Sequence, residues 1–543
     1  MAKSISFGEV NLDVEAGRSR QPPKPEPQTP FRVVVIGDFS GRSNHAAAGG
    51  QQTSRPRPML VDRDNLDEVM AKLGVRLSLR LGGEAGPHVE LRFREIEDFE
   101  PDSIYARADL FRTLRDARRR LADTSEFEKA AAELGLMQRG GQAGPESGSG
   151  TADQSLAASE SPAGGETATP DVVSLTGGSL LEGALEATVE RTRAASGAGG
   201  ISSRRREDDL SEFLRRAVAP YAVADPHPKQ EEVLARWDQA ISGQMRAVLH
   251  HPDYQALEAA WRGLYLLTRR LDTGTELKVY LIDCSKDELA EDLENCGDLR
   301  ECRLAKALTD SQGDWAADPG WALFAGLFRF DAAVSDTVLL ARMAVVAGYL
   351  GAPFVAEAVP SVFGCPDLST TADPADWKRP SAEAAESWTA LRAMPQSRHL
   401  ALAAPRFLLR PPYGEETVPA EEFPFEEVSV DDSTGLRHED FLWGNPAVAI
   451  ALMLGENFSR HGWDMRPGAV RELDGVSMYL YKQGGEPRQL PCAEAWLSER
   501  AADAMLDYGV LPLLARKDRD AVVLFDLRSL AAGDEPLAGP WDA

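Results

Sequence analysis

The sequence is poor in cysteine and in basic side chains, and each shortage excludes a class of protein. Its five cysteines among 543 residues are too few and too irregularly spaced for a disulfide framework. Fifty-nine Lys and Arg face 86 Asp and Glu, so the formal net charge is −27. Because nucleic acid and anionic lipid repel such a polyanion, we expect neither to be a partner.

Long apolar runs are also missing. No stretch of about 18 apolar residues occurs, so we expect no direct membrane insertion. The opening residues MAKSISFGEVNLDVEAG lack the cationic region and apolar run of a signal peptide. The apolar fraction of 43% is that of an ordinary globular protein. We therefore expect a folded, cytoplasmic protein.

The charge that is present is unevenly spread. Residues 1–139 hold 22 basic and 22 acidic side chains, so the whole net charge of −27 lies beyond them. Residues 140–178 are dominated by Gly, Ala, Ser, Thr, Pro and Glu, which is typical of a disordered, flexible linker. Together with the length, this pattern predicts two modules on one chain.

Residues 1–30 combine a short strand with a tether. Residues 17–30 contain five prolines and can form neither a helix nor an interior strand. A strand on such a tether has no local partner, so it either returns to its own domain or adds to the sheet edge of a neighbour. The apolar side chains of the strand are Ile5, Phe7, Val10, Leu12 and Val14.

Residues 31–139 predict a first compact αβ sandwich. A buried strand over 31–36 leads into the turn Gly37–Arg42. We expect a helix over 66–73, with Asp64 or Asn65 as its N-cap and Gly74 as its stop. Alternating runs at 75–81 and 88–94 predict a hairpin, and residues 103–122 predict one long amphipathic helix.

Residues 179–531 predict a second, layered α/β or α+β region, with two subdomains and a tail at 532–543. Its helices are expected at 180–193, 207–218, 286–294, 335–349, 445–459 and 492–508, with a long amphipathic run over 228–271. Its strands are expected at 277–284, 321–330, 478–481 and 522–525.

One motif invites an enzymatic interpretation. The turn Gly37–Arg42 follows a strand, as phosphate-binding loops do. Its GxxxG spacing matches neither GxxxxGK[ST] nor GxGxxG, so a structural turn is favoured over a nucleotide-binding enzyme.

The remaining reactive residues also favour structural roles. His250 and His251 are adjacent, so on a helix they point about 100° apart and favour capping or packing over metal binding. His461 and Asp464 lack a nucleophile motif nearby. We expect no catalytic residue, metal or cofactor. Two further groups complete this set: the thiols Cys284, Cys296 and Cys302, interpreted as small buried side chains rather than zinc ligands, and the clusters Glu421-Glu422, Glu426-Glu427 and Asp431-Asp432, interpreted as solvated loops.

Long stretches of both halves resemble the type VI secretion contractile sheath. Residues 4–135 are similar to the small sheath subunit (TssB, or VipA) through SISFG, PFRVVVIGDFSGR, VDRDNLDEVM and DFEPDSIYARADLFRTLRDARRRL. Residues 179–530 are similar to the large subunit (TssC, or VipB) through QMRAVLHHPDYQALEAAWRGLYLL, SRHLALAAPRFLLRPPYG, FLWGNPAVAIALMLGENFSRHGWD and LSERAADAMLDYGVLPLL. The resemblance implies a tail-sheath-like fold and a natural fusion of the two subunits.

The resemblance also implies partners and sites. These are other copies of the chain, other sheath subunits, an Hcp-type inner tube, the baseplate and the AAA+ unfoldase ClpV. It implies that the strand around Ile5–Val14 completes the sheet of another subunit. Residues 179–193 resemble the helix that recruits the unfoldase in some relatives, with Leu180, Leu181, Leu185 and Val189 on its apolar side.

One departure from the pattern leaves a second hypothesis open. Large subunits usually continue well beyond the part that matches residues 520–531, whereas here only GDEPLAGPWDA follows. The chain is thus expected either to build a sheath with a shortened large subunit or to act as a non-contractile adaptor that docks on a sheath or baseplate.

Overall fold

The computed structural model describes residues 2–7, 10–15, 25–46, 56–83, 86–134, 136, 230–310, 320–430 and 435–542. These divide into two units, each built from both halves of the chain. Unit 1 comprises Met1–Leu79, His88–Ala108 and Val248–Ala543, and unit 2 comprises Arg80–Pro87 and Asp109–Ala247. The expected linker and the expected helices at 180–193 and 207–218 lie outside the described residues, as do Leu180, Leu181, Leu185 and Val189.

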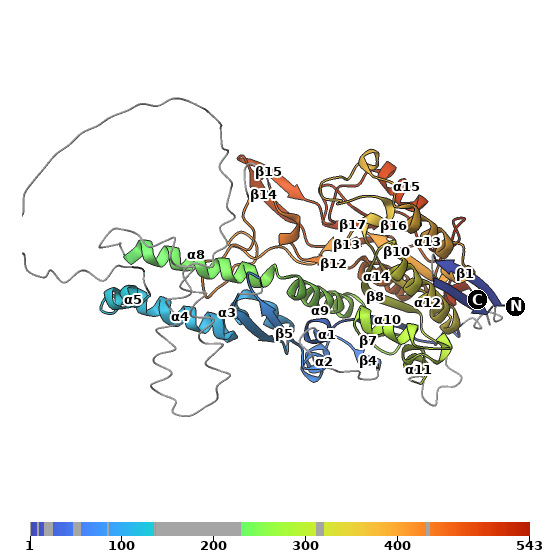
Figure 1. The fold of residues 1–543 in the computed structure, drawn as a ribbon, viewed down its shortest axis with the longest axis horizontal. Helices are drawn as coiled ribbons and strands as arrows, with labels where there is room; N and C mark the ends of the chain where they lie inside the picture. Colours follow the sequence, from blue (N-terminus) through green and yellow to red (C-terminus); the bar gives the residue numbers. More distant parts are fainter. Residues whose placement is uncertain are drawn as a thin grey trace, which may run out of the picture. The chain divides into compact units, whose positions relative to one another are not determined.

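Unit 1 is organised around one nine-stranded sheet, called here the main sheet, whose strands are labelled in part in Figure 1. Six neighbouring strands run parallel, and antiparallel strands close both edges. In spatial order the strands are β13 (Glu472–Asp474), β17 (Ala521–Leu524), β16 (Val510–Ala515), β10 (Leu400–Ala404), β9 (Phe354–Ala358), β8 (Leu323–Phe330), β3 (Phe31–Gly37), β7 (Leu277–Asp283) and β4 (Met59–Val61).

Strand β3 lies in the interior of the main sheet, although it comes from the N-terminal half of the chain. It pairs in parallel with β7, where Phe31 is opposite Leu277, and with β8, where Val33 is opposite Leu323. All seven residues of β3 are buried, as expected for a strand covered on both faces. The expectation of a separate sandwich over residues 31–139 is therefore wrong: its first strand completes a sheet made by the other half.

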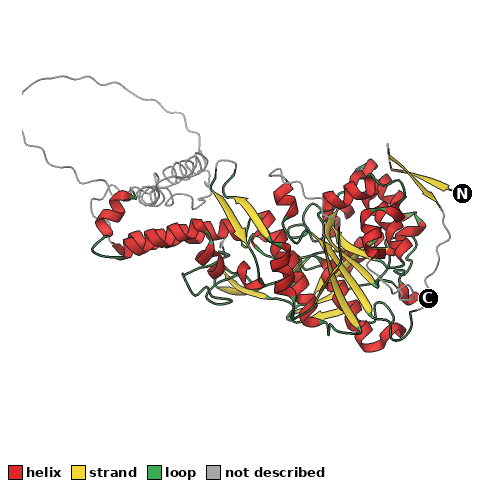
Figure 2. Cartoon of the chain, turned by 90° about the horizontal axis from the view of Figure 1, so that it is seen from below, coloured by secondary structure: helices red, strands yellow, loops and turns green. Residues whose placement is uncertain are grey.

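Helices cover both faces of the main sheet, as Figure 2 shows for the strands in yellow and the helices in red. Val34 and Ile36 of β3 belong to the core that includes α12, and the alternation of a strand sends Val33 and Val35 to the opposite face. The helices on the face of Val34 and Ile36 are α10 (Lys286–Glu294), α11 (Arg303–Asp310), α12 (Val334–Leu350) and α13 (Ala382–Arg392). A further helix, α14 (Pro446–His461), packs on β8, β9 and β10 and against α9 (Pro252–Arg270).

The N-terminal residues form a hairpin rather than a lone strand. β1 (Ala2–Phe7) pairs antiparallel with β2 (Val10–Glu15), with Ile5 opposite Leu12. The expectation that this segment has no local partner is thus wrong, because the residues before Gly8 supply one. Its pairing with another subunit remains a prediction.

Several smaller expectations are settled as well. The hairpin of residues 75–94 is confirmed by β5 (Arg76–Arg80) and β6 (His88–Arg92), and Gly74 ends α2 (Leu66–Leu73) with a φ of 64°. Asn65 precedes α2 but makes no side-chain cap. The single helix expected over 103–122 is instead α3 (Pro101–Arg107) and α4 (Asp109–Ala122), because Ala108 is extended.

The long run over 228–271 also splits. It forms α8 (Gln230–Leu249) and α9, which are separated at His250 and His251 because Pro252 has no N–H for a continuous helix. The helix expected over 492–508 is shorter, as α15 (Glu499–Asp507). The expected strand at 478–481 is β14 (Tyr479–Gln483), which pairs with β15 (Glu486–Leu490) apart from the main sheet.

Unit 2 packs α4, α5 (Phe127–Glu133) and α8 together. The indole of Trp237 in α8 donates to the backbone oxygen of Leu114 in α4 at 3.1 Å, and Arg118 forms an ion pair with Asp238 at 2.5 Å. These contacts again join the N-terminal half of the chain to the second half. None of the helices in the described ranges is long and apolar enough to cross a membrane.

Candidate functional site: contacts that join the two halves in unit 1

The turn Gly37–Arg42 is held by a carboxylate from the other half of the chain. Asp283, at the end of β7, accepts hydrogen bonds from the backbone N–H groups of Phe39 and Ser40 at 3.0 and 3.1 Å. It also accepts from the Ser40 hydroxyl at 2.8 Å and from the Arg42 Nε at 2.7 Å. Arg42 reaches Glu288 of α10 at 2.9 Å as well. Burial would lower the pKa of Arg42, but the two carboxylates outweigh it and raise that pKa.

This arrangement explains why the turn resembles a phosphate loop. Its N–H groups converge on one anion, which is what an anion cradle requires. The anion is Asp283 of the same chain, and the Asp38 carboxylate takes the next N–H groups, those of Arg42 and Ser43, at 2.6 and 2.7 Å. The donors that a nucleotide phosphate would need are used inside the fold, which supports the structural interpretation of the turn.

Three aromatic side chains of the second half donate hydrogen bonds to backbone carbonyls of the first half. Trp261 donates to Phe39 at 2.8 Å, Trp463 to Thr29 at 2.8 Å, and the Tyr254 hydroxyl to Phe99 at 2.7 Å. Trp261 and Tyr254 are fully buried. A buried carbonyl without a donor would be costly, so each of these bonds fixes where the first half sits.

Sequence reasoning did not find these residues, because a Trp or Tyr inside an amphipathic helix is usually an ordinary core residue. The ring contacts around them are ordinary core packing. The ring centroids of Phe39 and Trp261 lie 5.3 Å apart in an edge-to-face arrangement, and those of Phe31 and Phe458 lie 4.9 Å apart. These residues differ from ordinary core residues in the hydrogen bond that the polar atom of each side chain donates. The sequence does not show that bond, because the accepting carbonyl lies more than 150 residues away along the chain.

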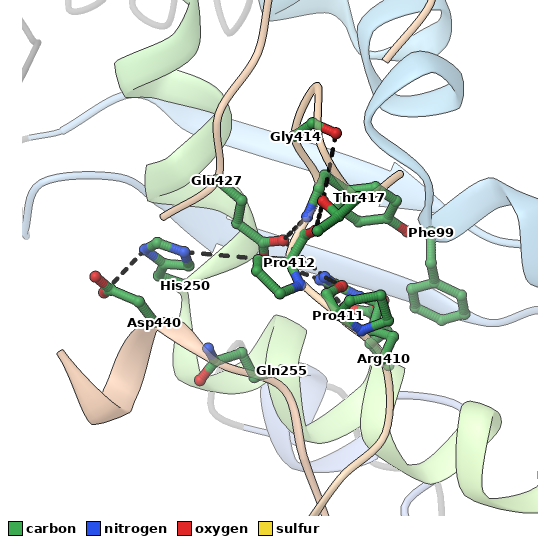
Figure 3. A network of polar contacts seen from close by, with 12 residues as sticks. Phe99, His250, Gln255, Arg410, Pro411, Pro412, Gly414, Thr417, Glu427 and Asp440 are labelled. Carbon is green, nitrogen blue, oxygen red and sulfur yellow. Dashed lines mark hydrogen bonds and ion pairs between the residues drawn. The ribbon is translucent and has the colours of Figure 1, made fainter. Parts of the chain in front are cut away.

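A network of buried charges lies beside these contacts, and Figure 3 shows the part of it around Arg410 and Glu427. Arg410 donates to Glu258 of α9 at 2.8 and 3.2 Å, and to Glu427 at 2.7 and 2.9 Å. Arg262 reaches Glu258 at 2.6 Å and the Tyr413 hydroxyl at 2.9 Å. The side chains of Glu258, Glu427 and Arg410 are at most 9% exposed.

The ionisation of this network follows from its geometry. Burial would raise the pKa of Glu258, but the guanidinium groups of Arg410 and Arg262 outweigh it and hold that pKa below its ordinary value. Burial raises the pKa of Tyr413 to about 12, so its phenol stays neutral. Glu427 was expected in a solvated loop with Glu426, and this is wrong: Glu427 is 2% exposed and pairs with Arg410.

The two adjacent histidines have the structural roles that were expected of them. His251 precedes α9 and its Nδ1 accepts from the N–H of Asp253 at 3.2 Å, which makes it the N-cap. The His250 ring nitrogens lie 3.2 Å from the Asp440 carboxylate and 3.9 Å from that of Glu427. Figure 3 marks both contacts with dashed lines. The histidine pair therefore caps one helix and contacts the charged network.

The same network fixes both ends of a loop, residues 413–427, called here the acidic loop. The Tyr413 N–H donates to the Glu427 carboxylate at 2.8 Å, and the Glu427 N–H donates back to the Tyr413 carbonyl at 2.9 Å. Asp102 of α3 accepts from the N–H groups of Glu421 and Glu422 at 2.8 and 3.1 Å. Glu421 and Glu422 are exposed, as expected. Asp431 and Asp432 lie outside the described residues.

A second buried network lies near the C-terminal ends of β9 and β10. Arg406 contacts Glu494 at 2.7 Å and Glu357 at 3.8 Å, and Arg329 contacts Glu357 at 2.7 Å. His438 lies 3.0 Å from Glu494. Burial would raise the pKa of Glu494, but Arg406 and His438 lower it to about 2.

The remaining candidates do not assemble into a reactive site. Burial raises the pKa of Cys284 and of Cys302 to about 12, so both thiols are protonated, and Cys296 donates to the Asp298 carbonyl. Within the described ranges, no group of three or more His, Cys, Asp or Glu is arranged to hold a metal ion. His461 ends α14, and Asp464 lies in the following turn, whose buried residue is Trp463.

Together, these features define an α/β fold in which strands of both halves of the chain form one sheet. Comparison with known families agrees. Residues 231–531 match the family described as EvpB/VC_A0108, tail sheath N-terminal domain, and residues 10–134 match that described as Type VI secretion system, VipA, VC_A0107 or Hcp2. The chain therefore belongs to the type VI secretion tail sheath family, and it carries a VipA-type and a VipB-type segment in one polypeptide.

A curated relative supports the VipB-type match. The type VI secretion system sheath protein TssC1 of Pseudomonas aeruginosa is 31% identical over 321 residues, which cover 57% of this chain and 63% of the relative. The chain thus spans less than two thirds of the length of that relative.

Proposed function

We propose that this chain is a self-assembling structural component of a type VI secretion sheath and that one polypeptide supplies both sheath subunits. The observation that carries the proposal is β3. A strand of the VipA-type segment lies inside a sheet made by the VipB-type segment, so the two form one building block. In this proposal the building block works in the cytoplasm and its role is mechanical rather than catalytic.

The proposed partners are further copies of the chain, other sheath subunits, an Hcp-type inner tube and the baseplate. The unfoldase ClpV is a further proposed partner through the helix expected at residues 179–193. The domain limits expected from the sequence also belong to this proposal, with the change that residues 31–139 complete a shared fold. The hairpin β1–β2 supplies the proposed inter-subunit strand, because each of its strands pairs only with the other among the described residues and leaves one edge open.

The test is assembly of the purified full-length chain, measured by sedimentation and electron microscopy, alone and with purified sheath subunits and Hcp. We expect ordered tubes or helical polymers. Protein that stays monomeric in every mixture, and recovers no sheath component in a pull-down, would contradict the proposal. Deletion of residues 1–14 should abolish assembly while circular dichroism and thermal unfolding stay unchanged; assembly at the original level would refute the role of the hairpin.

A further inference from the structure

The hairpin β14–β15 exposes an apolar face. Its strands are joined by Gly484 and Gly485, whose φ values of 59° and 84° both lie in the left-handed region. Two such residues form a type I′ turn, which matches the twist of the strands and favours a stiff hairpin. The hairpin is separate from the main sheet, as the labels in Figure 1 show.

The two faces of this hairpin differ. Tyr479 packs against Phe441 at 5.7 Å and stacks on Tyr481, so this face is attached to the rest of unit 1. Because side chains alternate along a strand, Leu480 points the other way, and it is 61% exposed. Met478, on the same side, is 37% exposed. These are two of the five large apolar side chains that are exposed among the described residues.

Unpaired cations surround the apolar face. Lys482 is exposed on the Leu480 face of the hairpin, and Arg516 and Lys517 are exposed in the turn between β16 and β17. That turn is attached to β15, because the Asp518 N–H donates to the Gln489 side chain at 3.3 Å. None of these three cations forms an ion pair with another described residue. A basic, apolar patch is unusual in a chain with a net charge of −27.

The acidic loop has the complementary character. It exposes Val418, at 42%, together with the four carboxylates Glu415, Glu416, Glu421 and Glu422. Residues 411–436 contain no Lys or Arg. The charged network of Arg410 and Glu427 holds the ends of the loop, and Asp102 holds the backbone of Glu421 and Glu422.

The two surfaces lie on opposite sides of one hairpin. Tyr479 and Leu490 pack against the cluster that contains Val428, the residue that directly follows the acidic loop, so the Tyr479 face lies on the side of that end of the loop. Leu480 faces away from that side. A second copy placed in line with the first would therefore bring its acidic loop onto the exposed face of the hairpin. Val418 of the loop would then contact Leu480, and the glutamates of the loop would face the cations beside the hairpin.

We propose that a second copy of this chain docks its acidic loop on the Leu480 face of β14–β15, in a head-to-tail contact. Such a heterologous contact repeats without closing on itself and generates rings or helical stacks. This inference rests on the proposed function, because it names one contact of the assembly.

Cross-linking tests the contact directly. The partly exposed Cys296 is first replaced by Ser, since the other native thiols are buried. One preparation then carries Val418→Cys and another Leu480→Cys, and a short bismaleimide is added to each alone and to their mixture. We expect a dimer that joins positions 418 and 480 in the mixture, identified by mass spectrometry of the linked peptides. Dimers in the Leu480→Cys preparation alone would overturn the head-to-tail geometry.

Charge reversal tests the complementarity. Lys482→Glu with Lys517→Glu, or Glu421→Lys with Glu422→Lys, should each raise the concentration needed for assembly about tenfold or more, since about 1.4 kcal/mol corresponds to tenfold. The chain that carries all four changes should recover assembly, because both surfaces are reversed in every copy. The matched control is Lys378→Glu with Arg379→Glu, which reverses two exposed cations elsewhere and should leave that concentration within about twofold.

The outcomes separate this inference from the proposed function. Tubes from the unmodified chain without a 418–480 cross-link, or with no recovery in the fourfold variant, would overturn the contact and leave the sheath role standing. A chain that forms neither polymers nor cross-linked dimers would contradict both.

Discussion

The indole nitrogen of Trp261 donates a hydrogen bond to the backbone carbonyl of Phe39, 222 positions earlier in the chain, at 2.8 Å. This bond joins the helix α9 of the VipB-type segment to the turn that follows β3 of the VipA-type segment. Its two ends are buried, so neither can exchange its partner for water while the protein is folded.

Trp261→Phe should therefore lower the free energy of unfolding by about 1–3 kcal/mol, because the Phe39 carbonyl is left buried without a donor. Urea denaturation followed by circular dichroism measures the loss. The matched control is Trp388→Phe, which removes a similar bond to the Tyr508 carbonyl within the VipB-type segment. Only Trp261→Phe should weaken the association of the VipA-type segment with the VipB-type segment. Equal weakening by both variants would show that the Trp261 hydrogen bond does not hold the two segments together.

Asp283→Asn should destabilise the fold by about 3 kcal/mol or more, since Arg42 and the turn amides lose the charge that they surround. Glu288→Gln weakens the second contact of Arg42, at a side chain that is 25% exposed, and keeps an oxygen that can accept from the Ser285 N–H, so it should cost much less. Thermal unfolding of both variants gives the ranking. Equal shifts would mean that the turn does not depend on Asp283.

The acid side of the stability profile should depend on Glu494. Its pKa is about 2 in the folded protein against an ordinary 4.5, so its contribution to stability is present above pH 4.5 and is lost as the pH falls towards 2. The shift corresponds to about 3 kcal/mol. Glu494→Gln should lower the free energy of unfolding at neutral pH, and that free energy should then decrease less steeply between pH 4.5 and 2. A profile parallel to that of the unmodified chain would contradict this assignment.

Assembly should increase with salt between low and moderate ionic strength. Each copy carries a net charge of −27, and stacked copies repel over the Debye length, which is about 10 Å at 0.1 M salt. The short contacts between the hairpin and the acidic loop are screened less than this long-range repulsion. Light scattering across a salt series measures the trend, and assembly that does not respond to salt would refute it.

Local patterns predicted the elements well but not their assembly. The alternation in residues 75–94, the stop at Gly74 and the helix over 286–294 depend on neighbouring residues, and the structure confirms them. The place of β3 depends on pairing with Leu277 and Leu323, more than 240 residues away, which no local pattern encodes.

The same limit applied to the site. Asp283 was visible only as one residue of the strand expected over 277–284, and its partners were visible only as a turn. The burial of Glu427 was missed because its neighbours Glu422 and Glu426 are exposed and the sequence does not show which carboxylate meets Arg410. The resemblance to sheath subunits identified the family, whereas the donors that join the halves required three-dimensional positions.

The central claim is that the two segments form one structural unit, and cleavage between them tests it most directly. A specific protease site is placed at residues 150–160, and the full-length chain is cut after folding. We predict that the fragments remain associated in size-exclusion chromatography and separate only in denaturant, with Trp261→Phe lowering the denaturant concentration needed. Fragments that separate in native buffer, each still folded, would contradict the account.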